Sequence, residues 1–374
     1  MKILMLNYEY PPLGGGGGVV TKALSEELVA LGHSVDVVTM GFKGLKKMEI
    51  INGVTIYRVP CIRKKKEMCK THEMLSYCIS AVPFVDKLNK LNHYDINHTH
   101  FILPTGIVAY LLKNKLPYVI TSHGTDVPGH NPDRFSFQHK LVNPIWKKVV
   151  NDAHLLIAPS TYLKDLILQN MVFNNVKVIN NGCNVYSFGP IKKDKKVLLV
   201  SRLFEFKGFQ HFLEAIKDIN INCEINIVGD GPYKDTLVNK SKMISNKVNF
   251  LGWVDNQTQT YNELFKTSSI FVHPSSAENC PVVLQEAMSS GCAIITTKNT
   301  GCAEIVGDTA LLVKPNDPEE IRDALLCLIN DDELMSELGH KARVRAENNF
   351  DWKIITIEYV NLYNDVLKSA LKNV

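Results

Sequence analysis

Short runs of β-branched and other apolar residues alternate along the chain with longer segments in which apolar residues recur every three or four positions. The first longer segment, 19–31, puts Val20, Leu24 and Leu28 on one stripe, and Gly32 follows as a stop signal. This alternation predicts parallel sheets built from strand–helix–strand units. We expect strands at 2–7, 34–40, 54–59, 95–99, 118–122, 154–158, 176–180, 196–202, 224–229, 248–251, 270–273, 293–297 and 310–313.

The 374 residues are more than one core usually organises. We therefore expect an α/β fold with two doubly wound, Rossmann-like domains, 1–190 and 191–351, that face one another across a cleft. The joint is expected near 186–196, where the run 187–190 interrupts regular structure. A last helix, about 352–371, has no strand after it and could pack on either domain. Ligands of such folds bind at the carboxyl ends of the strands.

Composition is that of an ordinary globular chain, with 45% hydrophobic and 21% charged residues, which excludes fibrous, repetitive and disordered classes. The opening MKILMLNYEY is too polar for a signal peptide, and no run reaches the roughly 18 apolar residues of a spanning helix. The nine cysteines include no Cys-x-x-Cys pair, so neither a zinc site nor a disulfide framework is indicated. We expect a cytoplasmic protein that does not bind nucleic acid.

Positive charge is concentrated in the first half. Residues 1–190 carry 21 basic against 13 acidic side chains, whereas residues 191–374 carry 21 against 25. Residues 43–70, here called the basic segment, hold nine lysines and arginines against two glutamates, with the densest run at 63–66. Such a field attracts anionic lipid head groups or an acidic acceptor, which would place the protein at the inner membrane face. A solvated loop explains the run equally well.

Five glycines, Gly14–Gly18, lie between the first strand and the first helix. Glycines allow close approach of a bulky anion, and free N–H groups at a helix start suit phosphate; a flexible turn is the alternative. The run does not match the dinucleotide-binding fingerprint, because Val19 stands at the third glycine position and Asp36 lies mid-strand rather than at the strand tip. This mismatch weakens the interpretation of the chain as an NAD-dependent dehydrogenase.

Histidines mark two other strands of the first half. His123 ends the strand 118–122 and is expected to face the cleft, although a histidine in such a position is more often structural. His98 and His100 share one side of a strand and resemble a metal pair, but no third ligand follows at a recognisable spacing. We therefore expect no metal site here.

In the second half, Arg202 ends a strand and Lys207 begins the helix after it. Two cations in these positions can bind a diphosphate without a metal, and solvated surface charges are the alternative. The turn 229–232, which contains Gly231, would let the backbone approach a nucleotide base, or it is only a turn.

Glu278 and Glu286 are eight residues apart, and a continuous helix would separate them by about 12 Å. The carboxylate pair of a glycosidase lies closer, at roughly 5 to 9.5 Å. The larger separation suits the two ends of a nucleotide sugar, with one carboxylate on the sugar hydroxyls and the other on the ribose. Alone, Glu286 would be an ordinary helix acid.

Taken together, these motifs resemble a retaining glycosyltransferase of the GT-B fold, most similar to glycosyltransferase family 4 (group 1). The shared motifs follow the family's order over nearly the whole chain. They are the glycine run, Ser122-His123-Gly124, Asn181-Gly182, Ser201-Arg202 with Lys207-Gly208, Gly229-Asp230-Gly231-Pro232, Glu278 with Glu286, Gly301-Cys302-Ala303-Glu304 and Phe350-Asp351-Trp352.

The resemblance implies a role for each site residue. Arg202 and Lys207 would bind the donor diphosphate, Glu278 the donor sugar and Glu286 the ribose. His123 would contact the transferred sugar near its anomeric centre. It also implies that the first domain faces the acceptor, that the second binds the donor, and that the last helix crosses back to the first. The remaining donor-binding residues would be Gly15, Gly16, Gly17, Gly231, Asn279, Cys280 and Val282.

The chain departs from the family after Glu278, where Cys280-Pro281 replaces the common Phe-Gly. Proline has no N–H to offer a sugar hydroxyl, so the sequence does not decide which sugar epimer is bound. Asn184 replaces the aspartate usual after the Asn-Gly motif, which we expect to have little effect.

The resemblance thus implies a retaining enzyme that transfers a hexosyl unit from a UDP- or GDP-sugar to a cell-envelope, lipid-linked or glycan acceptor. No Asp-x-Asp motif occurs, so we expect no metal or other cofactor, with Arg202 and Lys207 offsetting the charge of the leaving group. The motifs contain no carboxylate that is well placed to act as a nucleophile. This favours a same-face mechanism in which the leaving nucleotide helps to deprotonate the acceptor. A nucleotide-sugar epimerase of the same fold and a non-catalytic nucleotide-sugar binding module are the alternatives.

Overall fold

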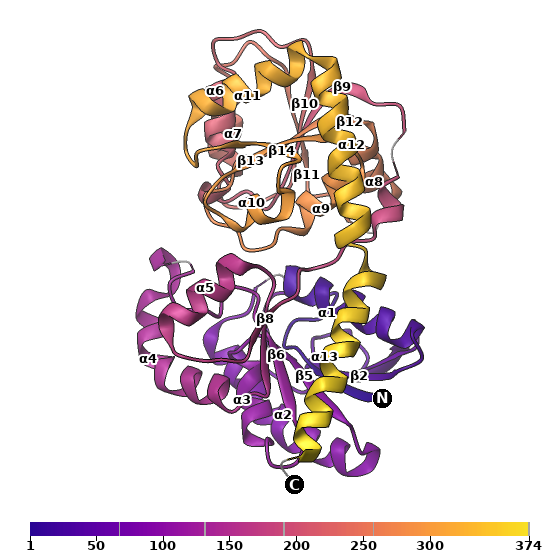
Figure 1. The fold of residues 1–374 in the computed structure, drawn as a ribbon. Coiled ribbons are helices and arrows are strands. Elements are labelled where there is room, and N and C mark those ends of the chain that lie inside the picture. The colour runs from indigo at the N-terminus through magenta and orange to yellow at the C-terminus, as the bar shows by residue number, and fades with distance from the viewer. Residues whose placement is uncertain (67, 131, 190, 257, 373–374) are drawn as a thin grey trace. The chain divides into compact units, whose positions relative to one another are not determined.

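The computed structural model describes residues 1–66, 68–130, 132–189, 191–256 and 258–372, and the chain forms two compact units (Figure 1). The first unit holds Met1–Asn180 and the chain from Trp352 onward, and the second holds Asn181–Asp351. The boundary lies ahead of the expected joint because the segment after Asn181 contributes Val185 and Phe188 to the core of the second unit. Pro190, which belonged to the expected joint, lies outside the described residues.

The first unit is built on an eight-stranded sheet in the order β3-β4-β2-β1-β5-β6-β7-β8. Its pairings are parallel except that of β3 with β4. The strands are β1 (Lys2–Leu6), β2 (Ser34–Met40), β3 (Met48–Ile51), β4 (Val54–Val59), β5 (Ile96–His100), β6 (Tyr118–Thr121), β7 (Leu155–Ala158) and β8 (Val176–Val178). The helices are α1 (Gly16–Ala30), α2 (Thr71–Asn92), α3 (Thr105–Leu111), α4 (Pro132–Asn151), α5 (Thr161–Asn170) and α13 (Trp352–Lys372).

Helices cover both faces of this sheet. On one face, Val20, Leu24 and Leu28 of α1 share a core with Ile355 and Tyr359 of α13, and Figure 1 shows the two helices side by side. On the other face, side chains of α2, α3 and α4 pack over the same strands. The last helix therefore completes the core of the first unit.

Two elements differ from the sequence prediction. The antiparallel strand β3 was missed, although Asn52 and Gly53 (φ of 49° and 80°) form the kind of turn that typically joins two hairpin strands. Helix α1 begins at Gly16 and not at Val19, so three of the five glycines form its first turn. A helix can start there because its first N–H groups need no intrahelical partner.

The second unit has a six-stranded parallel sheet in the order β11-β10-β9-β12-β13-β14. Among its described residues, the strands are β9 (Asp194–Val200), β10 (Glu224–Val228), β11 (Val248–Gly252), β12 (Ser268–His273), β13 (Ala293–Thr297) and β14 (Ala310–Val313). The helices are η1 (Val185–Phe188), η2 (Glu205–Lys207), α6 (Phe209–Ala215), α7 (Lys234–Ser241), α8 (Gln259–Thr267), α9 (Val282–Ser289), α10 (Gly301–Val306), α11 (Pro318–Asn330) and α12 (Asp332–Asn349). The predicted class, α/β with two doubly wound parallel sheets, is confirmed.

Within the described ranges, the structure contains no helix that is both long enough and apolar enough to cross a membrane.

Candidate active site

The predicted site residues form two sets, one in each unit. In the first unit, His123 follows β6, and Asp126 orients its backbone. Asp126 Oδ1 accepts hydrogen bonds from His123 N (3.0 Å) and from Ser122 Oγ (2.9 Å), while Oδ2 accepts from Ile102 N (2.6 Å). Burial raises the pKa of Asp126, and these hydrogen bonds oppose that shift. Asp126 stands three residues after His123, a spacing from which its orienting role could have been predicted.

The structure brings Gly17 and His123 together. A Cβ atom at Gly17 would lie 2.6 Å from Phe101 Cζ and 3.4 Å from His123 Cδ2, whereas one at Gly16 would meet nothing within 4 Å. Gly17 therefore allows the first turn of α1 to pack against the rings of Phe101 and His123. Gly17 and His123, 106 residues apart in sequence, are therefore neighbours in the fold.

The sequence suggested that the glycine run offers free N–H groups, but three of these groups are already bonded within the protein. Gly15 N donates to Glu9 Oε2 (3.1 Å), Gly14 N donates to Lys66 O (2.8 Å), and Gly18 N donates to Gly15 O (3.0 Å). A carboxylate already accepts from Gly15, and it would repel a phosphate at that position. The N–H groups of Gly14, Gly15 and Gly18 are therefore already engaged within the protein.

The basic segment contains two buried cations that the charge count treated as surface charges. The side chains of Arg58 and Arg63 are 1% and 0% exposed. Arg63 donates to Lys65 O (3.0 Å) and Lys66 O (2.8 Å), and Lys66 O also accepts from Gly14 N. Arg63 and Gly14 thus bond to the same carbonyl, which links the basic segment to the glycine run. In the run 63–66, only the three lysines are exposed.

The second set is centred on Glu278, in the loop between β12 and α9. Lys207 Nζ contacts Glu278 Oε1, and His273 Nε2 lies 2.8 Å from the same oxygen. Burial alone would raise the pKa of Glu278, but the Lys207 ammonium and the His273 hydrogen bond hold it well below its usual range. An ionised carboxylate only accepts hydrogen bonds, so the donor in this contact is His273 Nε2.

Lys207 lies in η2 and not in the following helix, and its segment is bonded to the Glu278 loop. Ser276 N donates to Phe206 O (2.9 Å), and a Cβ atom at Gly208 would lie 2.1 Å from Pro274 O. Gly208 also has a φ of 75°, which favours glycine. This close backbone contact joins the loop after β9 to the loop after β12, because the two strands are neighbours in the sheet.

Arg202 is exposed in the turn after β9, and that turn packs against the turn after β10. A Cβ atom at Gly229 would lie 1.8 Å from Ser201 O, and one at Gly231 would lie 2.4 Å from Leu203 O. Leu203 N also donates to Asp230 O (2.9 Å). Gly229 and Gly231 are therefore needed primarily because the neighbouring turn, which contains Arg202, packs so closely against them.

Glu286 lies on α9, and Tyr261 OH of α8 donates to its Oε2 (2.7 Å). Burial raises the pKa of Glu286 to about 7, and the bond from Tyr261 opposes that shift. Glu278 is outside α9, so the two glutamates are not on one continuous helix. A buried carboxyl that titrates near neutrality is typical of a functional site.

The other residues predicted around Glu278 lie at the start of α9. Cys280 O accepts from Asn181 Nδ2 (3.2 Å), and Val282 is the first residue of the helix. A Cβ atom at Gly301 would lie 1.6 Å from Asn279 O, which explains the glycine of that motif. The Asn-Gly motif at 181 thus positions Cys280.

Sequence reasoning missed His273 and Tyr261. His273 ends β12 just as His123 follows β6, and it precedes Glu278 by five residues, so its strand-end position was the available signal. Tyr261 lies on the apolar face of α8 and carried no signal of contact with Glu286. His98 was considered for metal binding, but its nitrogens contact Tyr363 OH (2.6 Å) and Thr121 Oγ1 (2.8 Å).

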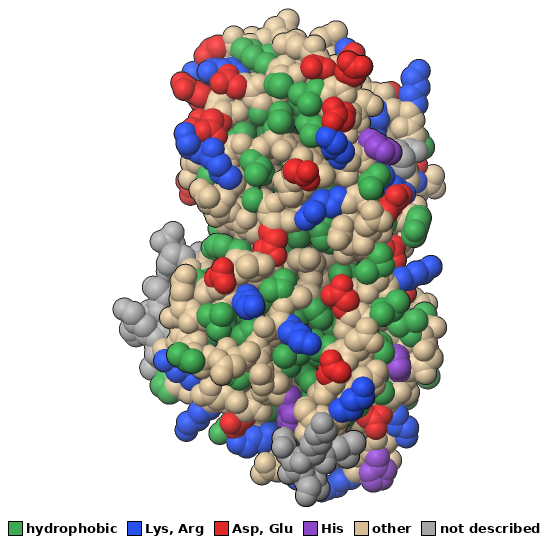
Figure 2. Space-filling view, viewed as in Figure 1, with side chains coloured by type: hydrophobic (Ala, Val, Ile, Leu, Met, Phe, Trp, Pro, Cys, Tyr) green, Lys and Arg blue, Asp and Glu red, His purple; other side chains and the backbone are tan. Residues whose placement is uncertain are grey.

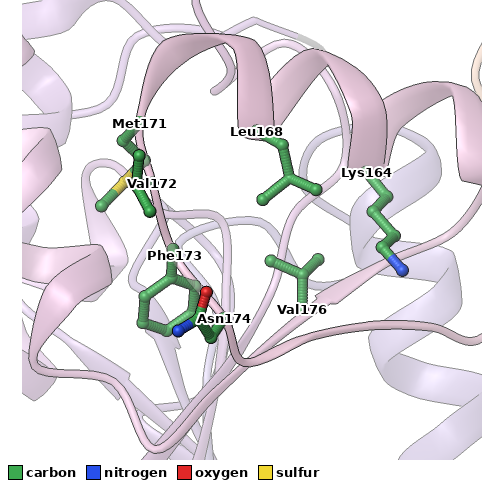
Figure 3. A pocket seen from close by; sticks show the side chains of 7 residues that line it. All are labelled: Lys164, Leu168, Met171, Val172, Phe173, Asn174 and Val176. Atoms are coloured by element: carbon green, nitrogen blue, oxygen red, sulfur yellow. The ribbon is translucent and has the colours of Figure 1, made fainter.

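A surface hollow between α5 and β8 contains none of the predicted site residues (Figure 3). Mostly apolar side chains line it, among them Leu168, Met171 and Phe173, with Lys164 at one end. It is a separate feature of the first unit.

Two protein-family models match the chain. Glycosyltransferase Family 4 matches residues 14–186, and Glycosyl transferases group 1 matches residues 186–345. The chain is 27% identical to N-acetyl-alpha-D-glucosaminyl L-malate synthase of Bacillus anthracis over 96% of both chains.

Two solved structures share the fold. Sucrose-phosphate synthase from Thermosynechococcus elongatus matches with a TM-score of 0.85 and 20% identity, over 98% of this chain and 99% of that one. HepE from Anabaena in complex with UDP-glucose matches with a TM-score of 0.77 and 19% identity, over 100% of both chains.

Proposed function

The chain belongs to glycosyltransferase family 4, and on that premise we propose that it transfers a hexosyl unit from a UDP-sugar, with retention, to a lipid-linked acceptor of the cell envelope. Its two α/β units have the GT-B fold. Membership of this family shows that the donor is a nucleotide sugar, and it implies retention of the anomeric configuration. The donor base, the sugar, the acceptor and the residue roles below are our proposal.

The observation that carries the proposal is the Lys207–Glu278–His273 cluster at the carboxyl ends of β9 and β12. A carboxylate held ionised accepts hydrogen bonds from sugar hydroxyls across the physiological pH range, and the ammonium beside it neutralises phosphate charge. We assign Glu278 to the donor sugar. Lys207, with the exposed Arg202, is assigned to the diphosphate.

Glu286 is assigned to the ribose, because Tyr261 holds one carboxyl oxygen and leaves the other for hydroxyl groups. Gly231 is placed by the turn beside Arg202, where a nucleotide base can approach the backbone. In the first unit, His123 is assigned to the transferred sugar and Gly15–Gly17 to the surface next to it. Asn279, Cys280 and Val282, around the start of α9, complete the donor set.

In the reaction, the bond between the anomeric carbon and the diphosphate oxygen breaks, and negative charge develops on the leaving UDP. Arg202 and Lys207 offset that charge. The acceptor hydroxyl attacks the anomeric carbon on the same face from which the leaving group departs. The proton of that hydroxyl passes to a phosphate oxygen of the leaving UDP. We assign Glu278 the role of a hydrogen-bond acceptor rather than a nucleophile, because Lys207 and His273 already bond its Oε1.

The Anabaena relative bound to UDP-glucose supports a UDP-sugar over a GDP-sugar. The Bacillus anthracis relative, an N-acetylglucosaminyl malate synthase by name, supports a hexosyl or N-acetylhexosaminyl unit. Pro281 offers no N–H to the sugar, so we expect the epimer preference to be set by side chains around Glu278.

The basic segment supports a lipid-linked acceptor. Lys64, Lys65 and Lys66 are exposed, and so are the apolar side chains of Ile62 (59%) and Ile79 (68%). Ile62 N donates to Ser76 Oγ (2.9 Å), which holds the segment against the first turns of α2, where Ile79 lies. Exposed apolar side chains beside lysines suit an anionic membrane surface.

On the face drawn in Figure 2, acidic and basic side chains are interspersed. We therefore propose peripheral attachment, from the cytoplasmic side, through the basic segment and the start of α2.

The test is a donor screen followed by a product assay. UDP-glucose, UDP-N-acetylglucosamine and GDP-mannose are compared by thermal shift, and the stabilising donor is then incubated with lipid-linked acceptors. We expect stabilisation by a UDP-sugar and acceptor-dependent release of UDP with retained configuration. Epimerised donor without an acceptor would indicate the epimerase, and binding without turnover over a broad acceptor set would indicate a binding module. Stabilisation by GDP-mannose alone would overturn the UDP assignment.

A further inference from the structure

His100 lies between two other histidine rings in the first unit. Its ring stacks on that of His98, with centroids 4.4 Å apart, and on that of His123, with centroids 5.3 Å apart. His100 Nδ1 lies 3.1 Å from His123 Nε2, which is a hydrogen bond between two ring nitrogens. The sequence predicted a ligand role for His123 but left His100 only as one member of an incomplete metal pair.

The three rings are neutral at physiological pH. Burial lowers the pKa of His98 and of His123 to about 3, and it lowers the pKa of His100 well below its ordinary value. A neutral imidazole carries one proton, so its two nitrogens are one donor and one acceptor. The bond between His100 and His123 therefore determines which nitrogen of His123 carries the proton.

The other nitrogen of His100 indicates the direction of that bond. His100 Nε2 is buried and, among the described residues, has no hydrogen-bond partner. A proton on Nε2 would leave a buried N–H donor unsatisfied, whereas a proton on Nδ1 leaves only an unpartnered acceptor. Buried N–H groups without partners are the rarer of the two. His100 therefore carries its proton on Nδ1.

We propose that His100 is a positioning residue that donates its Nδ1–H to His123 Nε2 and so holds His123 in the tautomer protonated on Nδ1. His123 then presents a hydrogen-bond donor to its ligand and cannot act there as a base. This step rests on the proposed function only for the identity of the ligand. In that function, the Nδ1–H group of His123 donates to an oxygen of the transferred sugar.

Surrounding groups hold His100 in the required orientation. Both nitrogens of His98 are engaged, by Tyr363 of α13 and by Thr121 of β6, so its ring is fixed and the stacked ring of His100 is held with it. Asp126 fixes the backbone of His123. The orientation is therefore set before a ligand binds.

The test is nitrogen-15 NMR of the histidine rings in the full chain, because the two tautomers differ in which ring nitrogen is protonated. The His123 signals are identified as those lost in His123→Asn. We expect the proton on Nδ1 in the wild type and in His100→Asn, whose amide N–H can replace the lost donor. In His100→Leu, we expect the tautomer protonated on Nε2 to appear. A proton on Nε2 in the wild type would overturn the proposal.

Kinetics give a second readout. We expect kcat of His100→Leu to fall by about tenfold or more, with a smaller change in KM for the donor, and His100→Asn to recover most of the loss. Equal kcat in wild type and His100→Leu would contradict the positioning role. If His100→Leu does not fold, the wild-type and His100→Asn spectra still decide the tautomer. Absence of transferase activity in a protein with the expected tautomer would count against the proposed function alone.

Discussion

Lys207 and Glu278 form an ion pair inside the second unit, with 16% and 12% of their side chains exposed. Lys207 comes from η2, and Glu278 comes from the loop after β12, 71 residues later. The motifs assigned the two residues to different parts of the donor, yet in the structure they contact one another. In the proposed function, a bound donor would therefore meet them as a unit, with His273 as the third member.

The ion pair predicts that Lys207→Ala weakens donor binding and turnover. The lost charge-assisted contact is worth roughly 1.5 to 3 kcal/mol, or about 10- to 150-fold in the Kd for the donor. Arg202→Ala is expected to act in the same direction, with less effect on stability because Arg202 is exposed. Calorimetric titration with the donor and measurement of kcat/KM check both variants.

The matched control is Lys234→Ala. Lys234 also pairs with a carboxylate, that of Asp230, but 35% and 54% of those side chains are exposed. The change of charge is the same, and we expect nearly wild-type donor binding. Equal losses in Lys234→Ala and Lys207→Ala would show a general charge effect, and unchanged kinetics in Lys207→Ala and Arg202→Ala would remove the diphosphate assignment.

Glu286 predicts a pH dependence of stability. Its folded pKa of about 7 lies above the unfolded value of about 4.3, so the folded state holds the extra proton between these values. The free energy of unfolding therefore falls as pH rises through that window, by up to about 4 kcal/mol from this group. Glu286→Gln cannot titrate and should lose this component, as measured by urea unfolding from pH 4.5 to 8.

A second variant tests the cause of the Glu286 shift. Tyr261→Phe removes the hydrogen bond that favours the ionised carboxyl, so the fall in stability should extend to higher pH. Wild-type and Glu286→Gln curves that stay parallel over the whole range would contradict the assignment.

Gly17 and Gly16 make a matched pair in the first turn of α1. Gly17→Ala places a Cβ atom 2.6 Å from Phe101 Cζ and should cost about 1 to 3 kcal/mol of stability and reduce activity, because a shifted Phe101 ring disturbs the His123 ring packed against it. Gly16→Ala meets nothing within 4 Å and should be neutral or stabilising by up to about 1 kcal/mol. Thermal unfolding and kcat are measured for both variants.

The clash at Gly17 also predicts a rescue. Phe101→Leu shortens the obstructing side chain, so the double variant Gly17→Ala with Phe101→Leu should recover part of the stability lost by Gly17→Ala. Similar behaviour of the two alanine variants at positions 16 and 17 would mean that the contact with Phe101 does not limit this turn.

The basic segment predicts salt-sensitive binding to phosphatidylglycerol vesicles. At about 1 kcal/mol per basic residue, changing Lys64, Lys65 and Lys66 to Ser should weaken binding roughly 100-fold and leave donor hydrolysis intact. Arg63 is kept, because its buried side chain holds the segment together. Sedimentation with anionic and neutral vesicles at low salt is the measurement.

The control for this experiment removes three exposed lysines of the second unit, Lys240, Lys242 and Lys247. It changes the net charge equally, and we expect it to sediment like the wild type. Wild-type binding that is equal for anionic and neutral vesicles, or absent with both, would favour a small soluble acceptor and make the basic segment a solvated loop.

Activity is expected to survive EDTA. The chain has no Asp-x-Asp motif, and in the proposed function Lys207 and Arg202 supply the positive charge beside the leaving diphosphate. Initial rates with and without chelator, after dialysis, check this expectation. Complete loss that magnesium or manganese restores would refute it.

The strands were predictable because each lies in a buried parallel sheet, where a short apolar run bounded by turn residues is a local signal. Expected and observed strands agree at 34–40, 54–59, 293–297 and 310–313. The edge strand β3 was missed because its side chains are mostly exposed and carry little apolar pattern. The start of α1 was missed because helix propensity disfavours glycine, whereas the first turn depends on packing against Phe101.

The α/β class, the order of the motifs and the strand ends with the predicted site residues could be predicted from the sequence, because periodicity and turn chemistry are local properties of the chain. Which of these residues touch became clear only from the folded chain. Glu278 meets Lys207 because β9 and β12 are neighbours, and His98 meets Tyr363, 265 residues away, because α13 packs on the first sheet. Strand order and helix packing are set by the whole core, so spacing along the chain could not reveal that Arg63 is buried or that His100 directs His123.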